Sequence, residues 1–318
     1  MLLYNVIGFA VAVFIMVKAG SYAVKYISSI AKEDKISVFL TSFLFIGVVS
    51  SFPEGFISVV SALKGEPALG FGTLLGGNIA DLSLVLGIIA VAAGSIRIHN
   101  REFAHDFWLV GLVMLPVLFS LDGTVGRLEG FALIAACLMF VFGMLREGHV
   151  LSKLTHNSKG AAKNLALFAV SSSVVLVAAN FVVNYAEGLA ADLSIPIALI
   201  GIVFIGVTTT LPELMFSLAA VKKHMDGLAL GDVFGTVIID ATLLTGITAL
   251  ISPVHLVGVN IINLATFSAL AVSASIFFLK PGKVFTRNQG VLLIMLYVLF
   301  VATEAKIFGM RLLPSIRS

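Results

Sequence analysis

Two segments of the chain combine hydroxyl groups, a proline and a carboxylate in the same order. Residues 45–54 read FIGVVSSFPE and residues 204–213 read FIGVTTTLPE. Each lies in a hydrophobic stretch long enough to span a membrane, where an ionisable group is costly and indicates a functional site. The proline frees a backbone carbonyl in the preceding turn. Hydroxyl, carbonyl and carboxylate oxygens together predict a site for an alkali or alkaline-earth cation.

The spacing within these segments places the candidate ligands on shared helical faces. Polar positions three and four residues apart lie on one side of a helix, and Thr236 and Asp240 repeat that spacing further along the chain. The predicted ligands are all oxygen donors: Glu54, Glu213, Asp81, Asp240, Ser50, Ser51, Thr209, Thr210 and Thr236. A set without histidine or cysteine disfavours zinc and copper, and a flexible cage of about 6–8 oxygens favours Ca²⁺. A lone glutamate could instead be an interhelical hydrogen-bonding group, but two matching pairs of carboxylates argue against that interpretation.

The composition indicates the class of protein that positions these residues. The 318 residues are 59% hydrophobic and 12% charged, with a mean hydropathy of +1.10, whereas a soluble domain carries about 25% charged residues. Apolar runs of about 20 residues, the length that spans a bilayer, recur along the chain. We therefore expect an all-α integral membrane protein. The single cysteine, Cys137, provides no disulfide framework, and no run of basic residues interleaved with aromatics indicates nucleic-acid binding. We infer no protein partner and no cofactor.

Hydropathy and helix breakers predict ten transmembrane helices, at residues 3–27, 36–62, 69–95, 105–121, 127–145, 163–188, 195–221, 228–251, 257–279 and 287–304. The loops after the odd-numbered helices hold most of the basic residues: Lys32, Lys35, Arg97, Arg101, Arg146, Lys153, Lys159, Lys163, Lys222, Lys223, Lys280, Lys283 and Arg287. The other side holds only Lys64, Arg127, Lys306, Arg311 and Arg317. Because cytoplasmic loops carry the excess of lysine and arginine, we expect both termini outside the cell and a location in the plasma membrane.

The two halves of the chain repeat each other. At an offset of 159 residues (213 − 54), the proline–glutamate pairs coincide, and Asp81 coincides with Asp240. Chance similarity between apolar sequences rarely aligns proline, glutamate and aspartate together. Five helices per repeat is an odd number, so the second repeat must enter the membrane in the opposite sense. We therefore predict two inverted-topology five-helix repeats, residues 1–159 and 160–318, which form a single transport unit with its ion site near the midplane.

The repeated motifs carry a resemblance to a known family. VSSFPE (residues 49–54) and TTTLPE (208–213) resemble a family segment that reads approximately GTSLPE. GGNIAD (76–81) and GTVIID (235–240) resemble its second segment, GSN followed by I-F-N or I-F-D. Over its whole length the chain resembles the sodium/calcium exchanger family of the calcium/cation antiporter superfamily, in its prokaryotic ten-helix type.

The resemblance implies a role for each candidate ligand. It makes Glu54 and Glu213 the central Ca²⁺-ligating residues, and it places Asp81 and Asp240 beside the central site. The hydroxyl and carbonyl ligands next to the glutamates would come from Ser50, Ser51, Thr209 and Thr210. The transported ions would be Ca²⁺ and Na⁺, with the lipid bilayer as the surroundings.

Two positions depart from the family pattern. Gly77 stands where relatives usually have a serine that helps to hold a sodium ion, whereas Thr236 keeps a hydroxyl in the other half. Asp81 is acidic where many relatives have asparagine, so the site carries up to four negative charges, more than one Ca²⁺ neutralises. Crowded carboxylates in a low dielectric repel one another, so we expect one or two to be protonated at neutral pH.

The leading interpretation is a secondary antiporter, not an enzyme, that exchanges Ca²⁺ for Na⁺ by alternating access. A Ca²⁺/H⁺ or K⁺-dependent exchanger is the alternative, and a channel would conduct Ca²⁺ without a counter-ion. An intramembrane aspartyl protease is a remote alternative, because Asp232 follows Ala229, Leu230 and Gly231 and so does not match the G-x-G-D pattern. Asp232 is expected to attract entering cations near the mouth of its helix or, equally, to cap the start of that helix.

Overall fold

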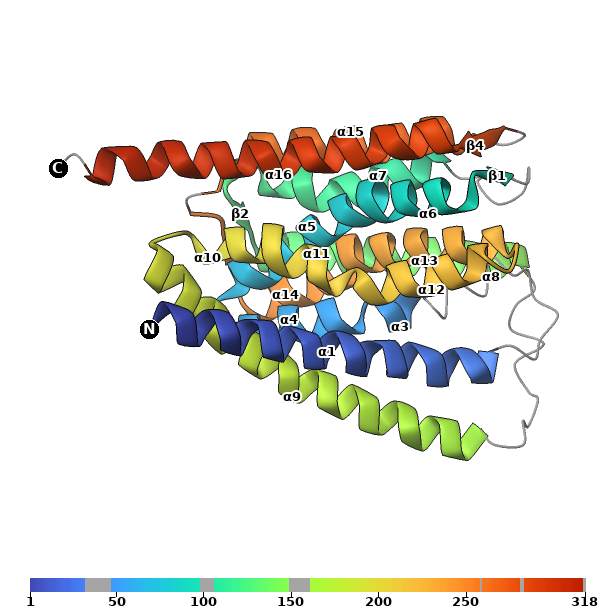
Figure 1. Ribbon diagram of the computed structural model, residues 1–318, viewed down its shortest axis with the longest axis horizontal. Helices are drawn as coiled ribbons and strands as arrows, with labels where there is room; N and C mark the ends of the chain where they lie inside the picture. The colour runs from blue at the N-terminus through green and yellow to red at the C-terminus, as the bar shows by residue number, and fades with distance from the viewer. Residues whose placement is uncertain (32–46, 98–105, 149–160, 258, 281–282, 317–318) are drawn as a thin grey trace.

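The computed structural model describes residues 1–31, 47–97, 106–148, 161–257, 259–280 and 283–316. Within these residues the chain forms a bundle of long helices that run side by side (Figure 1). The predicted all-α class is therefore confirmed. The start of the predicted second helix and most of the predicted linker between the halves lie outside the described residues.

The helices occur in the same order in both halves of the chain. The first half contains α1 (Leu2–Ala31), α3 (Gly47–Ser50), α4 (Phe52–Leu63), α5 (Pro67–Ala80), α6 (Leu86–Ala93), α7 (Asp106–Phe119) and α8 (Arg127–Gly148). The second contains α9 (Ala161–Leu193), α10 (Ile197–Leu199), α11 (Gly206–Thr209), α12 (Leu211–Val221), α13 (Asp226–Ile239), α14 (Thr245–Ile251), α15 (Ile261–Phe278) and α16 (Arg287–Ile316). The intervening π-helical turns are Asp81–Val85, Ile200–Ile205 and Asp240–Leu244, and a 3₁₀ turn, Ser120–Asp122, follows α7.

Several of these helices have the length and the apolar composition of membrane-spanning helices. By length and composition, seven spans within the described residues are long and apolar enough to cross a membrane. Two further apolar helices, Phe52–Leu63 and Leu109–Asp122, are shorter. The predicted class of integral membrane protein agrees with this finding, while the number of ten transmembrane helices stays a prediction.

Both proline motifs interrupt a helix at the same place. α3 ends at Ser50, and α4 starts two residues later with Pro53 in its first turn. α11 ends at Thr209, and α12 starts two residues later with Pro212 in its first turn. Proline has no N–H to donate and is tolerated at the start of a helix, so it ends one helix and begins the next. Broken backbone at membrane depth is stable only where protein or a polar cavity surrounds it.

Glycines let the broken helices cross helices of the opposite half. A Cβ atom on Gly47 of α3 would lie 2.8 Å from the Gly235 backbone in α13. A Cβ atom on Gly76 of α5 would lie 2.1 Å from the Ile202 carbonyl oxygen. Because Gly206 of α11 likewise meets the Gly77 backbone, the two halves contact each other backbone to backbone beside the proline motifs.

Two short antiparallel ribbons, which the sequence did not predict, join helix ends of opposite halves. β1 (Ser95–Arg97) pairs with β4 (Val284–Thr286), and β2 (Thr124–Val125) pairs with β3 (Val254–His255). Ile96 lies opposite Phe285 in the first ribbon, and both side chains are fully buried. In Figure 1, β1 and β4 lie at one end of the bundle, whereas β2 and both chain termini lie toward the other end.

The close crossing at Gly76 leads to a stability prediction. Gly76→Ala should lower the melting temperature of the purified protein, because overpacking typically costs about 1–3 kcal/mol. The matched control is Gly143→Ala in α8, where an added Cβ meets no atom within 4 Å. That change should leave the melting temperature equal or slightly higher, since alanine favours a helix over glycine by roughly 1 kcal/mol. Equal melting temperatures for the two variants would show that the crossing is not tight.

Candidate functional site

The four predicted carboxylate ligands lie together inside the bundle. Glu54, Asp81, Glu213 and Asp240 are buried, with at most 1% of any of them exposed. Their charges act on one another: Glu54 interacts electrostatically with Asp81, Glu213 and Asp240. Folding thus gathers acidic residues from both halves into one region that solvent does not reach.

These carboxylates have no hydrogen-bond partners. Both oxygens of Glu54, Asp81, Glu213 and Asp240 are buried without a donor among the described residues. An unpaired buried charge is penalised by several kcal/mol, and here four such groups also repel one another. Buried polar groups are otherwise almost always paired, so this cluster requires a compensating positive charge. Cations that bind oxygen fit the donor set.

The helix breaks position the two central glutamates. Glu54 lies in the first turn of α4, and Glu213 lies in the first turn of α12. The start of a helix carries a partial positive charge, which stabilises a carboxylate placed there. Asp81 and Asp240 each begin a π-helical turn, a local widening that is frequent at functional sites. Each half therefore supplies one carboxylate at a helix start and one at a π turn.

The hydroxyls next to the glutamates donate to their own helices. Ser51 Oγ donates to the Gly47 carbonyl at 2.9 Å, and Thr209 Oγ1 donates to the Ile205 carbonyl at 3.0 Å. Thr210 Oγ1 donates to Val207 in the same way, at 3.0 Å. Thr209 also faces Glu54 and Ser51 faces Asp240, but these two contacts fall outside hydrogen-bond geometry. A hydroxyl whose proton is engaged in this way keeps its oxygen lone pairs available for a cation.

The cluster does not converge as tightly as a closed metal site. Among the described residues, no three histidine, cysteine, aspartate or glutamate side chains are arranged as they would be around one metal ion. A cation would therefore combine one or two carboxylates with hydroxyl and carbonyl oxygens of the broken helices. This explains why the motif supplies serine or threonine two and three residues before the proline.

Asp232 belongs to this region, and its expected role as a helix cap is wrong. α13 starts at Asp226, after Met225, so Asp232 lies in the middle of the helix, where it is fully buried. Ser50 Oγ donates to its Oδ1 atom at 2.6 Å, and Ser217 Oγ donates to its Oδ2 atom at 3.2 Å. The signal was present in the sequence, because Asp232 precedes Thr236 by four residues and so shares its helical face.

Asn78 is a further polar residue of this region, and it was not predicted as a ligand from the sequence. Its side-chain amide is buried, and neither its nitrogen nor its oxygen has a hydrogen-bond partner among the described residues. It stands one turn before Asp81 in the GGNIAD motif. Its amide is a further candidate oxygen donor on the Asp81 side of the cluster.

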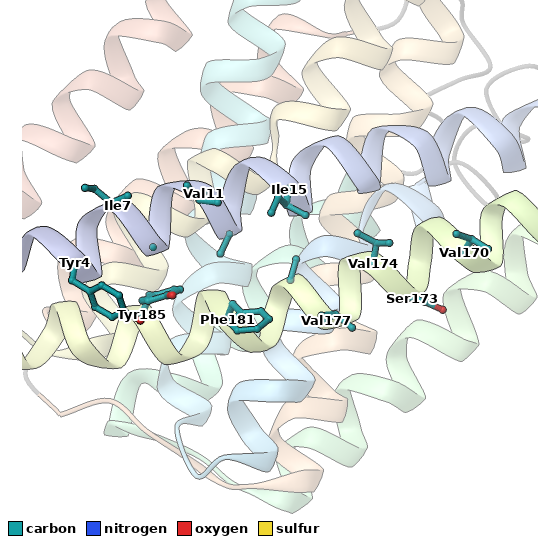
Figure 2. A pocket seen from close by; sticks show the side chains of 13 residues that line it. Tyr4, Ile7, Val11, Ile15, Val170, Ser173, Val174, Val177, Phe181 and Tyr185 are labelled. Atoms are coloured by element: carbon teal, nitrogen blue, oxygen red, sulfur yellow. The ribbon is translucent and has the colours of Figure 1, made fainter.

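A large groove lies elsewhere, on the side of the bundle formed by α1 and α9 (Figure 2). Its volume is about 750 Å³, and its walls carry mostly apolar side chains such as Ile7, Val11 and Phe181. Tyr4 and Tyr185 stand together at one end, with ring centroids 5.7 Å apart. None of the described residues that line it carries a carboxylate, and the four buried carboxylates lie elsewhere, inside the bundle.

Comparison with known proteins agrees with this architecture. A family model described as sodium/calcium exchanger protein matches residues 4–146 and again residues 163–305. The sodium/calcium exchanger MaX1 of Methanosarcina acetivorans is 22% identical over 330 residues, covering 90% of this chain and 94% of that protein. The putative antiporter CaxA of Alkalimonas amylolytica is 25% identical over 291 residues, covering 85% of this chain and 89% of the relative.

A solved structure of the sodium-calcium exchanger NCX_Mj, soaked with 2.5 mM Na⁺ and 0.1 mM Sr²⁺, has the same fold. It superposes with a TM-score of 0.70 at 24% sequence identity, covering 95% of this chain and 99% of that chain. The family match spans both halves of the chain, including all four buried carboxylates. The chain therefore belongs to the sodium/calcium exchanger family.

Proposed function

We propose that this protein is a secondary antiporter that exchanges Ca²⁺ for Na⁺ across the plasma membrane by alternating access. The observation that carries the proposal is the cluster of four buried carboxylates without hydrogen-bond partners. The names of MaX1 and NCX_Mj, which are exchangers of these ions, support the same function. Relatives of this kind are transporters and not enzymes, and no step of the proposed cycle changes a covalent bond.

The mechanism follows from the charge of the site. Glu54 and Glu213 would bind the central cation, with Asp81 and Asp240 beside it and the hydroxyls of Ser50, Ser51, Thr209, Thr210 and Thr236 completing the shell. One Ca²⁺ or several Na⁺ ions would compete for the same carboxylates. With one or two of the four carboxylates protonated, a filled site is close to neutral and can be enclosed in a low dielectric, whereas an empty site holds uncompensated charge and resists closure. Exchange is then obligatory, because the protein changes its access only when cations fill the site.

The proposed division into residues 1–159 and 160–318 accounts for alternating access. The supporting observations are the common order of elements in the two halves and the two separate matches of the family model. The site lies where the halves cross at Gly47 and Gly235. Small movements of one half against the other would therefore open it first to one side of the membrane and then to the other.

Flux measurements test the function directly. Purified protein in liposomes loaded with Na⁺ should take up ⁴⁵Ca²⁺ from a Na⁺-free medium, and uptake should stop when the Na⁺ gradient is abolished. Ca²⁺ uptake without any counter-ion would instead identify a channel. Uptake driven by a pH or K⁺ gradient in the absence of Na⁺ would identify the alternative counter-ions, for which the acidic Asp81 and the missing hydroxyl at Gly77 are the supporting features.

The central glutamates should dominate cation binding. Glu54→Gln and Glu213→Gln should each weaken Ca²⁺ binding by roughly a hundredfold or more, since loss of one member of a buried charge pair costs about 3–5 kcal/mol. Equilibrium binding of ⁴⁵Ca²⁺ to purified protein measures the effect. Glu304→Gln is the matched control, because Glu304 is also buried but accepts a hydrogen bond from Asn263 Nδ2 at 2.7 Å. Affinity equal to wild type in either motif variant would refute the site assignment.

The proposed orientation places both termini outside the cell. In a Cys137→Ala background, Asp122→Cys should react with a membrane-impermeant maleimide in intact cells. Lys283→Cys should react only after permeabilisation, because it precedes β4 at the opposite end of the bundle from β2 (Figure 1). Both positions are exposed in the structure. Labelling of both in intact cells would contradict the proposed topology.

A further inference from the structure

Asp232 differs from the other carboxylates of the buried cluster. It is fully buried in α13, yet both of its oxygens accept hydrogen bonds, from Ser50 of α3 and from Ser217 of α12. Its charge also acts on Asp81 and Glu213. It therefore contacts the candidate site through a hydroxyl, whereas the four carboxylates described above have no hydrogen-bond partner in the part of the chain that the structure describes.

The hydrogen bond from Ser50 to Asp232 sets the directions in which the hydroxyl groups of Ser50 and Thr236 point. Ser50 has one proton, and it donates that proton to Asp232 Oδ1 at 2.6 Å. Thr236 Oγ1 lies 3.3 Å from Ser50 Oγ and 3.4 Å from the Gly47 carbonyl, and it is the donor in both contacts. An ionised carboxylate only accepts hydrogen bonds, so it fixes the order of the chain Thr236, Ser50, Asp232. Cations bind to the lone pairs of a hydroxyl oxygen, and these lie on the side of the oxygen opposite to the donated proton; one lone pair of Ser50 accepts from Thr236.

The other half of the molecule lacks this arrangement. The position equivalent to Asp232 is Thr73, whose hydroxyl donates within its own helix to the Leu69 carbonyl at 2.9 Å. The equivalent of Ser50 is Thr209, which donates to backbone carbonyls, and the equivalent of Thr236 is Gly77, which has no hydroxyl. The chain of hydroxyls that ends on a carboxylate is thus present on one side of the cluster only.

We propose that Asp232 is a positioning residue that holds the Ser50 and Thr236 hydroxyls with their oxygens available to a monovalent cation on this side of the site. Carbonyl and hydroxyl oxygens are neutral ligands, which suit Na⁺, whereas the divalent ion depends mainly on the carboxylates. Removal of the acceptor therefore weakens Na⁺ binding more than Ca²⁺ binding. This inference rests on the proposed exchange function and adds a specificity-determining residue outside the ligand shell.

Two substitutions of Asp232 separate the effect of its hydrogen-bond acceptor from the effect of its charge. Asp232→Asn removes the charge but keeps an oxygen that accepts from Ser50, while its amide nitrogen can donate to Ser217, whose hydroxyl already contacts the Ala229 carbonyl at 3.3 Å. Asp232→Val removes both charge and acceptor, because a valine side chain has no polar atom, and it keeps the shape of Thr73, the residue at the equivalent position of the first half. The first half shows that the fold accommodates a side chain of this shape at the equivalent place.

The experiment measures ⁴⁵Ca²⁺ binding to the purified full-length protein and its displacement by Na⁺. Asp232→Val should need about fivefold more Na⁺ than Asp232→Asn to displace half of the Ca²⁺, the effect expected from one lost hydrogen bond. Their Ca²⁺ affinities should differ by less than twofold. Thr73→Val is the matched control and should leave both affinities at the wild-type values. In a Ser50→Ala background the difference in Na⁺ affinity between Asp232→Val and Asp232→Asn should disappear, because the hydroxyl through which the aspartate acts is absent.

Each outcome of this experiment either supports or refutes the positioning role of Asp232. If Asp232→Asn and Asp232→Val give the same Na⁺ affinity, the acceptor has no role and the inference is refuted. A parallel loss of Na⁺ and Ca²⁺ affinity in Asp232→Val would also refute it, because a general structural defect acts on both ions. Should Asp232→Val not fold, Asp232→Ala provides the same comparison. If Na⁺ displaces no bound Ca²⁺ from the wild-type protein, the proposed exchange function is refuted. This outcome is distinguishable from the others because it appears in the wild type and not only in the variants.

Discussion

The structure depends on keeping four acidic side chains unpaired inside an apolar bundle. Glu54, Asp81, Glu213 and Asp240 have no hydrogen-bond partners within the described chain, so the free energy of the unoccupied cluster is high. The surrounding architecture serves this arrangement. Prolines end helices so that two glutamates meet helix starts, π turns carry the two aspartates, and glycines allow the backbones of opposite halves to touch. A protein with this interior gains stability whenever cations bind, and this is the energetic basis of coupled transport.

The sequence predicted those parts of the structure that have local causes. Hydropathy located the helices, and the pair of proline–glutamate motifs located Glu54 and Glu213, because a proline and a charge in an apolar run have few explanations. The ribbons at Ser95–Arg97 and Thr124–Val125 could not be predicted, since two or three residues carry no periodicity and their partners lie far along the chain. Of the two roles expected for Asp232, the helix cap is wrong because it depends on where α13 starts, and that start lies six residues earlier, at Asp226. The direction of the Ser50 hydrogen bond depends on packing between halves and has no local signal.

The repeat is symmetric in backbone and asymmetric in side chains. A perfectly symmetric inverted repeat would present the same chemistry to both sides of the membrane and would have equal free energies in its two access states. Here one side has Thr73 and Gly77, and the other has Asp232 and Thr236. We therefore expect the two access states to differ in free energy, so that their resting populations are uneven. In the proposed cycle the ion gradients set the direction of net exchange, while these few positions set which access state is favoured at rest.

The two ribbons have a mechanical consequence for the molecule. Each joins a helix end of the first half to a helix end of the second, through β1 with β4 and through β2 with β3, and the ribbons lie toward opposite ends of the bundle. Neither includes α1 or α9, which pack against each other along one side. The ribbons thus tie helix ends of the first half to helix ends of the second at both ends of the bundle, and among the described residues α1 and α9 pack beside the other helices without a ribbon of their own. A movement of one half against the other must therefore carry these short ribbons with it or pivot about them.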